Sequence, residues 1–205
     1  MESTVETGKQ QLESILKKVG AWQSGHFLLS SGLHSNEYIQ CQKLLQYPRY
    51  GLLFADALVQ KLKSDGINVR TVVGPALGAV HWEMLVSMAL DKEAGTDLAR
   101  GLFAERPEGT FEIRRGVELE PNEEVLVVED VTTTGGSARE VVELVRKLGA
   151  KPVAVGTIID RSGGTVNFDV PFYPLVKLNL ATYKPEECPL CAEGSQVVKL
   201  GSKKK

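Results

Sequence analysis

The 205-residue sequence has no long hydrophobic run, since no stretch approaches the roughly 18 consecutive apolar residues typical of a membrane-spanning helix. Its beginning, MESTVETGKQ, also lacks the basic stretch and the apolar run of a secretion signal. A large excess of one charge is missing too: the formal net charge is −2, which argues against nucleic acid or an anionic membrane as a partner. We therefore expect a cytoplasmic protein that binds neither and holds any anionic ligand through local groups.

Cysteine is scarce, and the three residues Cys41, Cys188 and Cys191 are too few for a disulfide framework. Two of them form a C-x-x-C pair in the stretch EECPLCAEG. A zinc site usually needs a second pair of ligands, and the nearby sequence offers no histidine to supply it. The pattern favours a surface turn near the C-terminus over a partial metal site completed by another subunit, and leaves both open.

No repeat, low-complexity segment or long linker divides the chain, so we expect a single domain spanning residues 1–205. Apolar residues at helical spacing predict helices at 12–19 and at 48–66, the second with Pro48 in its first turn. Between them, FLLSSG and EYIQC predict two short strands around a turn.

From Thr71 onward, strand-like and helix-like segments alternate. The predicted strands are TVVG, LARGLFAE, FEIRRGVEL, VLVVED and KPVAVGTIID, and the predicted helices are ALGAVHWEMLVSMAL and SAREVVELVRKLGA. Apolar strands separated by helices predict an α/β fold with a central parallel sheet flanked by helices on both faces. The strand ends at Gly74, Glu129 and Asp160 should then converge on one crevice. We expect a core of about residues 46–171, and a small hood over the crevice built from about 1–45 and 172–205.

The loop TTTGGS follows the strand VLVVED and contains no charged residue. Gly135 and Gly136 permit close approach of a ligand, and the loop N–H groups and the start of the next helix favour an anion such as phosphate. The sequence has neither G-x-x-x-x-G-K-[ST] nor a G-x-G-x-x-G after a strand, so the common nucleoside-triphosphate and dinucleotide motifs are absent.

Two adjacent acids, Glu129 and Asp130, precede this loop. Carboxylates repel a phosphate but accept hydrogen bonds well from the neighbouring hydroxyls of a sugar. An acid pair beside a phosphate loop therefore predicts a ribose 5-phosphate ligand, with its hydroxyls at the acids and its phosphate at the loop. The alternative is that the acids only begin a turn and cap the following helix.

The stretch VLVVEDVTTTGGS resembles the phosphoribosyl-pyrophosphate (PRPP) signature of the type I phosphoribosyltransferases. Further stretches, GHFLLSSGLHSNEYIQC, VVGPALGA, FAERPEGTFEIRRG and IIDR, resemble the orotate phosphoribosyltransferases, in their shorter bacterial and archaeal form. The resemblance implies transfer of ribose 5-phosphate from PRPP to orotate, giving orotidine 5′-monophosphate and pyrophosphate in pyrimidine biosynthesis. It also implies Mg²⁺, held mainly by pyrophosphate and the ribose hydroxyls and not by protein ligands.

The resemblance further implies roles for individual residues. Arg106, Glu129 and Asp130 are the expected catalytic residues, and Thr133 and Arg161 are expected to contact orotate, with Tyr38 and Ile39 near its ring. The expected PRPP-binding residues are Arg106, Glu129, Asp130, Val131, Thr132, Thr133, Thr134, Gly135, Gly136 and Ser137. Alternatives remain for the two arginines: Arg106 as an ordinary surface residue of a hairpin loop, and Arg161 as a salt-bridge partner of Asp160.

A mobile loop between LFAE and FEIRRG is implied to reach the site of a neighbouring subunit, which requires at least a homodimer. The longer enzymes of the family carry lysines at two places where this chain has Ser30 and Leu77–Gly78.

Two other functions share the fold. One is a PRPP-binding regulator, which would need a basic surface for nucleic acid, and the other is a purine phosphoribosyltransferase, which would have little use for Arg161.

Overall fold

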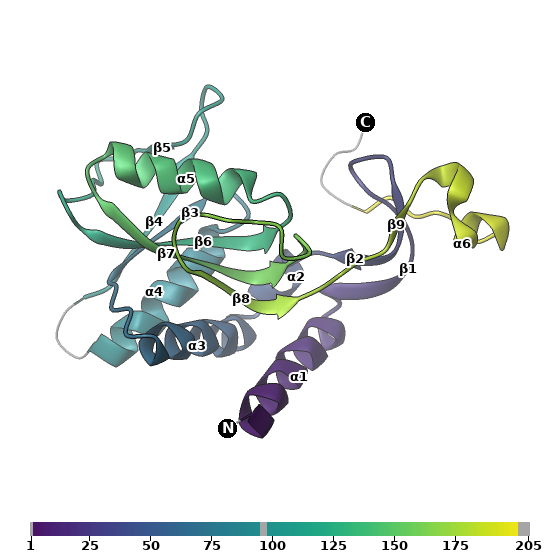
Figure 1. The fold of residues 1–205 in the computed structure, drawn as a ribbon, viewed down its shortest axis with the longest axis horizontal. Helices are drawn as coiled ribbons and strands as arrows, with labels where there is room; N and C mark the ends of the chain where they lie inside the picture. The colour runs from purple at the N-terminus through teal and green to yellow at the C-terminus, as the bar shows by residue number, and fades with distance from the viewer. Residues whose placement is uncertain (1, 95–97, 201–205) are drawn as a thin grey trace.

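The computed structural model describes residues 2–94 and 98–200 (Figure 1). The ends of the expected domain, residue 1 and residues 201–205, lie outside the described residues. In chain order the elements are α1 (Glu2–Lys18), β1 (Trp22–Leu28), β2 (His34–Ile39), α2 (Gln42–Leu45), α3 (Pro48–Ser64), β3 (Thr71–Pro75), α4 (Val80–Ala94), β4 (Arg100–Glu105), β5 (Glu112–Ile113), β6 (Glu124–Thr132), α5 (Gly136–Lys147), β7 (Lys151–Asp160), β8 (Phe172–Lys177), β9 (Thr182–Tyr183), the 3-10 helix η1 (Pro185–Glu187) and α6 (Pro189–Ala192).

The main sheet has six strands in the order β5-β4-β3-β6-β7-β8, and every neighbouring pair except β4–β5 is parallel. This confirms the predicted α/β fold with a mostly parallel sheet. β6 lies in the middle, with its Val127 opposite Val73 of β3 and Val155 of β7. All three side chains are fully buried, as expected for strands covered on both faces.

Helices cover the sheet on both faces (Figure 1). α3 and α4 lie on one face, where Leu58 and Val86 join a hydrophobic cluster with Leu126 of β6. α5 lies on the other face, and its Val141 and Val145 pack in a second cluster around the same strands. Within the described part of the chain, no helix combines the length and apolar character needed to cross a membrane.

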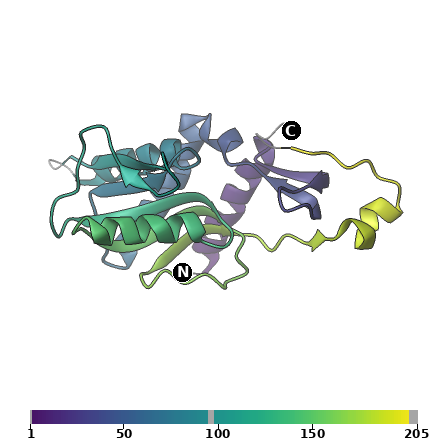
Figure 2. The same ribbon diagram turned by 90° about the horizontal axis from the view of Figure 1, so that it is seen from above.

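A second, smaller sheet forms the hood. Its strands are antiparallel in the order β1-β2-β9, so the first and last parts of the chain meet there. The predicted strand pair near residues 27–41 is present, although β1 begins at Trp22, earlier than the pattern FLLSSG indicated. From above, residues 178–200 leave the core after β8, run outward to α6 and return along the hood (Figure 2).

Two boundaries of the predicted hood need correction. β8 was assigned to the hood, but it pairs in parallel with β7 and forms an edge of the main sheet. α1 was also assigned to the hood, yet Leu12, Ile15 and Leu16 belong to the same hydrophobic cluster as Leu58 and Val176. α1 therefore stabilises the core face, and the hood consists of β1, β2, β9 and residues 178–200.

The segment FEIRRGVEL was predicted to be a strand, but only Glu112–Ile113 pairs, antiparallel to β4. The strand stops because Arg115 adopts a left-handed backbone conformation, with φ of 68°, which ends an extended chain. The following Gly116 has φ of 74° and continues the turn.

Candidate active site at the carboxyl ends of the parallel strands

The acid pair lies at the carboxyl end of the central strand. Glu129 and Asp130 lie among the last four residues of β6, with β3 on one side of this strand and β7 on the other. Glu129 pairs in register with Thr157 of β7. Both carboxyl-bearing residues are only partly exposed. Because β6 is the middle strand, the acids lie where a ligand can be reached from both neighbouring strands.

The environment of the acid pair disfavours two negative charges. Burial raises the pKa of Glu129, and the neighbouring Asp130 carboxyl raises it further. Burial also raises the pKa of Asp130, although Val131 N–H donates a hydrogen bond to Asp130 Oδ1 at 2.8 Å. No ion pair to either acid forms among the described residues. The pair is therefore suited to hydrogen-bond donors or a cation supplied by a ligand.

The loop after β6 connects the strand to α5 and contains no charged side chain. Thr133, Thr134 and Ser137 are exposed, whereas the Thr132 hydroxyl is buried and has no hydrogen-bond partner among the described residues. The N-terminus of α5 follows at Gly136, so its free N–H groups point to the same side. Backbone donors, hydroxyls and a helix N-terminus together form a site for an anion.

Gly135 is required by the geometry of this loop. It has φ of 73°, and a β-carbon there would lie 2.8 Å from Val166 Cγ1 and 3.0 Å from the Phe168 ring. Any larger residue would meet both a strained backbone and a steric clash. The side chains of Val166 and Phe168 thus pack against one side of the loop, and the opposite side is left to a ligand.

The loop after β3 approaches the acid pair from the other side. A β-carbon at Gly78 would lie 3.1 Å from Asp130 Oδ1, so this backbone packs closely on the carboxyl group. Gln42 Nε2 donates to the Gly78 carbonyl at 3.0 Å, and the Cys41 thiol lies 3.6 Å from the Asp130 carbonyl. Burial raises the pKa of Cys41, and Asp130 and Glu129 raise it further. These contacts join α2 and the residue before it to the crevice, and no sequence pattern predicts them.

Arg161 lies directly after β7, and its backbone N–H donates to the Thr132 carbonyl at 2.8 Å. Its Nε is buried without a hydrogen-bond partner, and no ion pair involves Arg161 in the described part of the chain. Asp160, the expected salt-bridge partner in the alternative interpretation, instead accepts from Ser162 N–H at 2.8 Å. Burial lowers the pKa of Arg161, whereas Tyr38 of the hood raises it. A half-buried guanidinium whose Nε has no hydrogen-bond partner among the described residues is suited to a planar anion.

The hood contributes Tyr38 and Ile39 from the end of β2. Tyr38 is partly exposed and packs against Phe27, with ring centroids 5.5 Å apart. Ile39 is buried in the main hydrophobic cluster. Of the two residues expected near an orotate ring, Tyr38 is therefore the one with an accessible side chain.

Arg106 is tied to its own chain and does not touch the acid pair. It follows β4, and its Nη2 donates to Glu140 Oε2 of α5 at 2.7 Å. Its guanidinium also stacks on the Phe111 ring, 4.2 Å from the centroid. The neighbouring Arg115 pairs with Glu105 in the same loop region, at 2.6 Å. Arg106 can reach a ligand only when it leaves Glu140.

Comparison with known proteins adds independent evidence. The family model for the phosphoribosyl transferase domain matches residues 41–190. An orotate phosphoribosyltransferase of Carboxydothermus hydrogenoformans is 51% identical over 180 residues, which cover 88% of this chain and 91% of that protein. One of Thermotoga maritima is 50% identical over 192 residues, covering 94% and 98%. A Mycobacterium tuberculosis orotate phosphoribosyltransferase, solved in complex with PRPP, has a similar fold, with a TM-score of 0.63, 22% identity and coverage of 83% and 96%.

Proposed function

The chain belongs to the phosphoribosyltransferase family, within its orotate phosphoribosyltransferases, and we propose that β6 and the loop after it hold PRPP while Arg161 selects orotate. The family's reaction transfers ribose 5-phosphate from PRPP to orotate in pyrimidine biosynthesis. One observation carries the assignment of the site: a buried acid pair with raised pKa values lies directly beside an uncharged anion-binding loop. A sugar phosphate fits both parts of the site, because its hydroxyls can bind the acid pair and its phosphate can bind the loop.

We propose that Glu129 and Asp130 accept hydrogen bonds from the two ribose hydroxyls. Displacement at the anomeric carbon develops positive charge on the sugar, and nearby carboxylates stabilise that charge. Hydrogen bonds donated by the sugar hydroxyls also favour the charged form of the two acids, which burial disfavours. The same contacts therefore favour ligand binding and the transition state.

The segment Val131–Ser137 would anchor the 5′-phosphate. Its backbone N–H groups, the hydroxyls of Thr132, Thr133, Thr134 and Ser137, and the flexibility of Gly135 and Gly136 supply the donors and the close approach that a phosphate needs. Fixing the phosphate converts binding energy into positioning of the anomeric carbon.

Arg161 and Thr133 would receive orotate. The unpartnered Nε of Arg161 can pair with a carboxylate, and the partly exposed Tyr38 lies close enough to influence the guanidinium. A neutral purine would leave this buried cation without a counter-ion. The full-length relatives named above are orotate enzymes, which favours the same substrate over a purine and over a regulatory role.

Mg²⁺ would be the metal ion of the reaction, as membership of the orotate phosphoribosyltransferases implies. The residues at the crevice fit this ion, because the two carboxyl groups offer oxygen ligands and lack a cationic partner of their own. When bound, this ion would neutralise part of the charge on the pyrophosphate leaving group, and the Glu129 and Asp130 carboxyl groups would be the protein oxygen atoms nearest to it.

We further propose a homodimer in which Arg106 acts on the pyrophosphate of the partner's site. In its own chain, β4 is separated from β6 by β3, and the Arg106 side chain is turned to α5. Breaking its exposed ion pair to Glu140 costs little, about 0–1 kcal/mol. A cytoplasmic location accords with three cysteines of which none forms a disulfide.

The test is a substrate panel. The purified protein is incubated with Mg²⁺, PRPP and, separately, orotate, uracil, hypoxanthine or xanthine, and pyrophosphate release is followed. Orotate alone is expected to give turnover, and Asp130→Asn is expected to abolish most of it. Release with a purine and none with orotate would contradict the proposal.

A further inference from the structure

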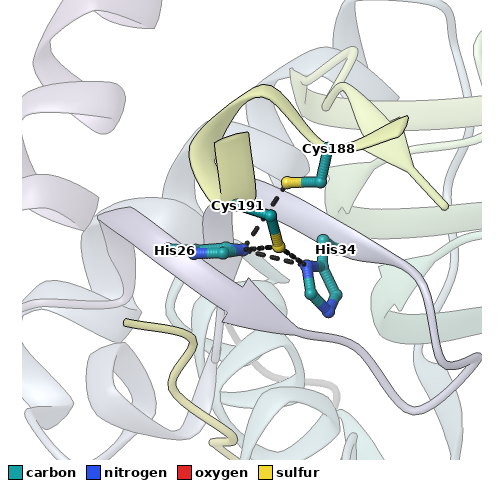
Figure 3. Close-up of side chains that lie close together, drawn as sticks. All are labelled: His26, His34, Cys188 and Cys191. Carbon is teal, nitrogen blue, oxygen red and sulfur yellow. Dashed lines mark hydrogen bonds between the residues drawn. The ribbon is translucent and has the colours of Figure 1, made fainter. Parts of the chain in front are cut away.

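Four potential metal ligands from two distant parts of the chain meet in the hood. His26 lies in β1, His34 begins β2, and Cys188 and Cys191 flank the first turn of α6 (Figure 3). The sequence near the C-x-x-C pair offers no histidine, but the fold brings two distant histidines to it. The two histidines are more than 150 residues away in sequence but adjacent in space.

Their side chains point toward one common centre (Figure 3). One nitrogen or sulfur from each residue lies within 4.8 Å of the other three. Cys188 Sγ and Cys191 Sγ are 3.5 and 3.7 Å from His26 Nε2, and Cys191 Sγ is 3.3 Å from His34 Nδ1. His26 Nε2 and His34 Nδ1 are 2.9 Å apart.

The three sulfur–nitrogen distances match those of a tetrahedral metal site. A zinc ion bound at about 2.0–2.1 Å to nitrogen and about 2.3 Å to sulfur holds its ligand atoms roughly 3.3–3.8 Å apart. The three sulfur–nitrogen distances fall in that range. The histidine pair is closer and would need to separate by roughly 0.4 Å to accommodate the ion. The distances from Cys188 Sγ to Cys191 Sγ and to His34 Nδ1 lie within 4.8 Å, so small movements of Cys188 would complete the tetrahedron.

Hydrogen bonding alone satisfies this cluster poorly. His26 Nδ1 lies 3.0 Å from the Ser195 carbonyl, which only accepts, so Nδ1 carries the proton. In the neutral ring, Nε2 then has a single lone pair, yet it faces His34 Nδ1 and both sulfur atoms. A cation at the centre attracts all four groups at once. The Ser195 carbonyl also fixes the orientation of His26, as outer partners of metal-binding histidines commonly do.

The segment that carries the two cysteines has almost no hydrophobic core. Between residues 179 and 200, Cys188 is the only buried residue. The segment is otherwise attached by backbone contacts, including Val198 N–H to the His26 carbonyl at 2.8 Å and Leu28 N–H to the Val198 carbonyl at 2.9 Å. Small units without a core commonly depend on a metal or a disulfide for stability.

We propose that His26, His34, Cys188 and Cys191 bind one structural zinc ion that fastens the C-terminal segment to the hood. Two nitrogen and two sulfur ligands in a tetrahedron suit zinc, and four protein ligands leave no open position for catalysis. Three of the four residues lie outside the 41–190 match to the phosphoribosyl transferase domain, so the site is an addition to that domain. It is separate from the acid pair proposed to receive PRPP.

The chain provides its own matched controls, because it has three cysteines and three histidines and the site uses two of each. Tag-free protein, purified without chelator, is analysed for metal by mass spectrometry. We expect about one zinc per chain in the native protein, in Cys41→Ser and in His81→Asn. Cys191→Ser and His34→Asn are expected to lose at least about nine-tenths of it. Cobalt substitution should give the visible absorption of a tetrahedral thiolate site.

Two further measurements distinguish a bound zinc ion from a metal-free cluster of the same four side chains. Cys191 is exposed, so as a free thiol it would react at once with a thiol reagent, whereas bound to zinc it should react only after chelator is added. A glutamate-specific protease should cut after Glu193 at least about tenfold faster in Cys191→Ser than in Cys41→Ser. Metal-free native protein that takes up no added zinc, iron as the bound metal, a Cys188–Cys191 disulfide, or equal zinc content in all variants would overturn the proposal.

Discussion

The Arg106 guanidinium donates to the Glu140 carboxylate of α5 at 2.7 Å, so the arginine proposed to meet pyrophosphate is held by its own chain. Both side chains are substantially exposed, at 39% and 50%, and such pairs are weak and screened by salt. The contact therefore holds Arg106 beside α5 only weakly. Its release is the motion that the proposed dimer mechanism requires.

Replacement of Arg106 is expected to affect turnover more than binding. Arg106→Ala should lower kcat about 100-fold, because the charge on departing pyrophosphate is greatest in the transition state. The Kd for orotidine 5′-monophosphate, measured by calorimetry, should change less than about threefold, since the nucleotide lacks the pyrophosphate. Arg115→Ala, which removes the neighbouring loop arginine paired with Glu105, is the control and should retain most activity. Equal, small effects of both changes would count against this role.

Mixing inactive variants tests whether Arg106 acts in the partner's site. In a mixed dimer of Arg106→Ala and Asp130→Asn chains, one site carries both defects and the other carries neither. Random exchange should therefore restore about a quarter of the native activity. Activity that stays at the level of the separate variants would show that Arg106 works within its own chain or not at all.

Arg161 is expected to determine orotate affinity. Arg161→Ala should raise KM for orotate about 30-fold, which corresponds to about 2 kcal/mol for a charge-assisted hydrogen-bonded pair. KM for PRPP should change less than about twofold, because Arg161 lies at the end of β7 and outside the phosphate loop. Arg146→Ala, on the exposed last turn of α5, serves as the control. A larger effect on PRPP than on orotate would contradict the assignment.

An alanine at position 135 would meet both backbone strain and a steric clash, and comparison with Gly149 separates the two effects. At Gly149, φ is 84° but a β-carbon would meet nothing within 4 Å, so Gly149→Ala should lower the free energy of unfolding by about 1 kcal/mol. Gly135→Ala adds a clash with Val166 and Phe168 and should cost about 3 kcal/mol. Urea denaturation measures both. Equal losses would mean that the loop yields to the added methyl group.

Glu83 should make stability depend on pH. It is 1% exposed, lies over Gly101 of β4, and burial raises its pKa to about 7 from 4.5. Between these values the unfolded chain has lost the proton and the folded chain keeps it, so stability falls as pH rises from about 4.5 to 7 and then levels. The loss is up to about 3 kcal/mol. Glu83→Gln should remove the part of this slope that Glu83 contributes and leave the part due to the raised pKa values of Glu129 and Asp130, whereas exposed Glu124→Gln should keep the whole slope.

The sequence was sufficient to predict the parallel sheet and the place of the crevice. Strands such as VLVV are apolar throughout because both faces are covered, and that composition can be read without a structure. The convergence of Glu129 and Asp160 follows from the same rule, because neighbouring parallel strands end at one edge. The acid pair and the loop lie together because they are consecutive in the chain.

What the sequence could not predict depends on pairing between distant segments. β8 contains Pro174, which weakens its strand pattern and is tolerated because β8 is an edge strand. The meeting of His26 and His34 with Cys188 depends on the register of β1 with β2 and on the return of the C-terminal segment. The contacts of Gln42 and Cys41 with the crevice depend likewise on how α2 packs, and none of these is a local property.

The most direct test of the account is a crystal structure of the protein with PRPP and Mg²⁺. We expect both ribose hydroxyls within hydrogen-bond distance of the Glu129 and Asp130 carboxylates, and the 5′-phosphate surrounded by the N–H groups between Thr132 and Ser137. A phosphate bound at the acid pair would contradict the account, and so would PRPP bound elsewhere with the crevice at the end of β6, after Val128, left empty.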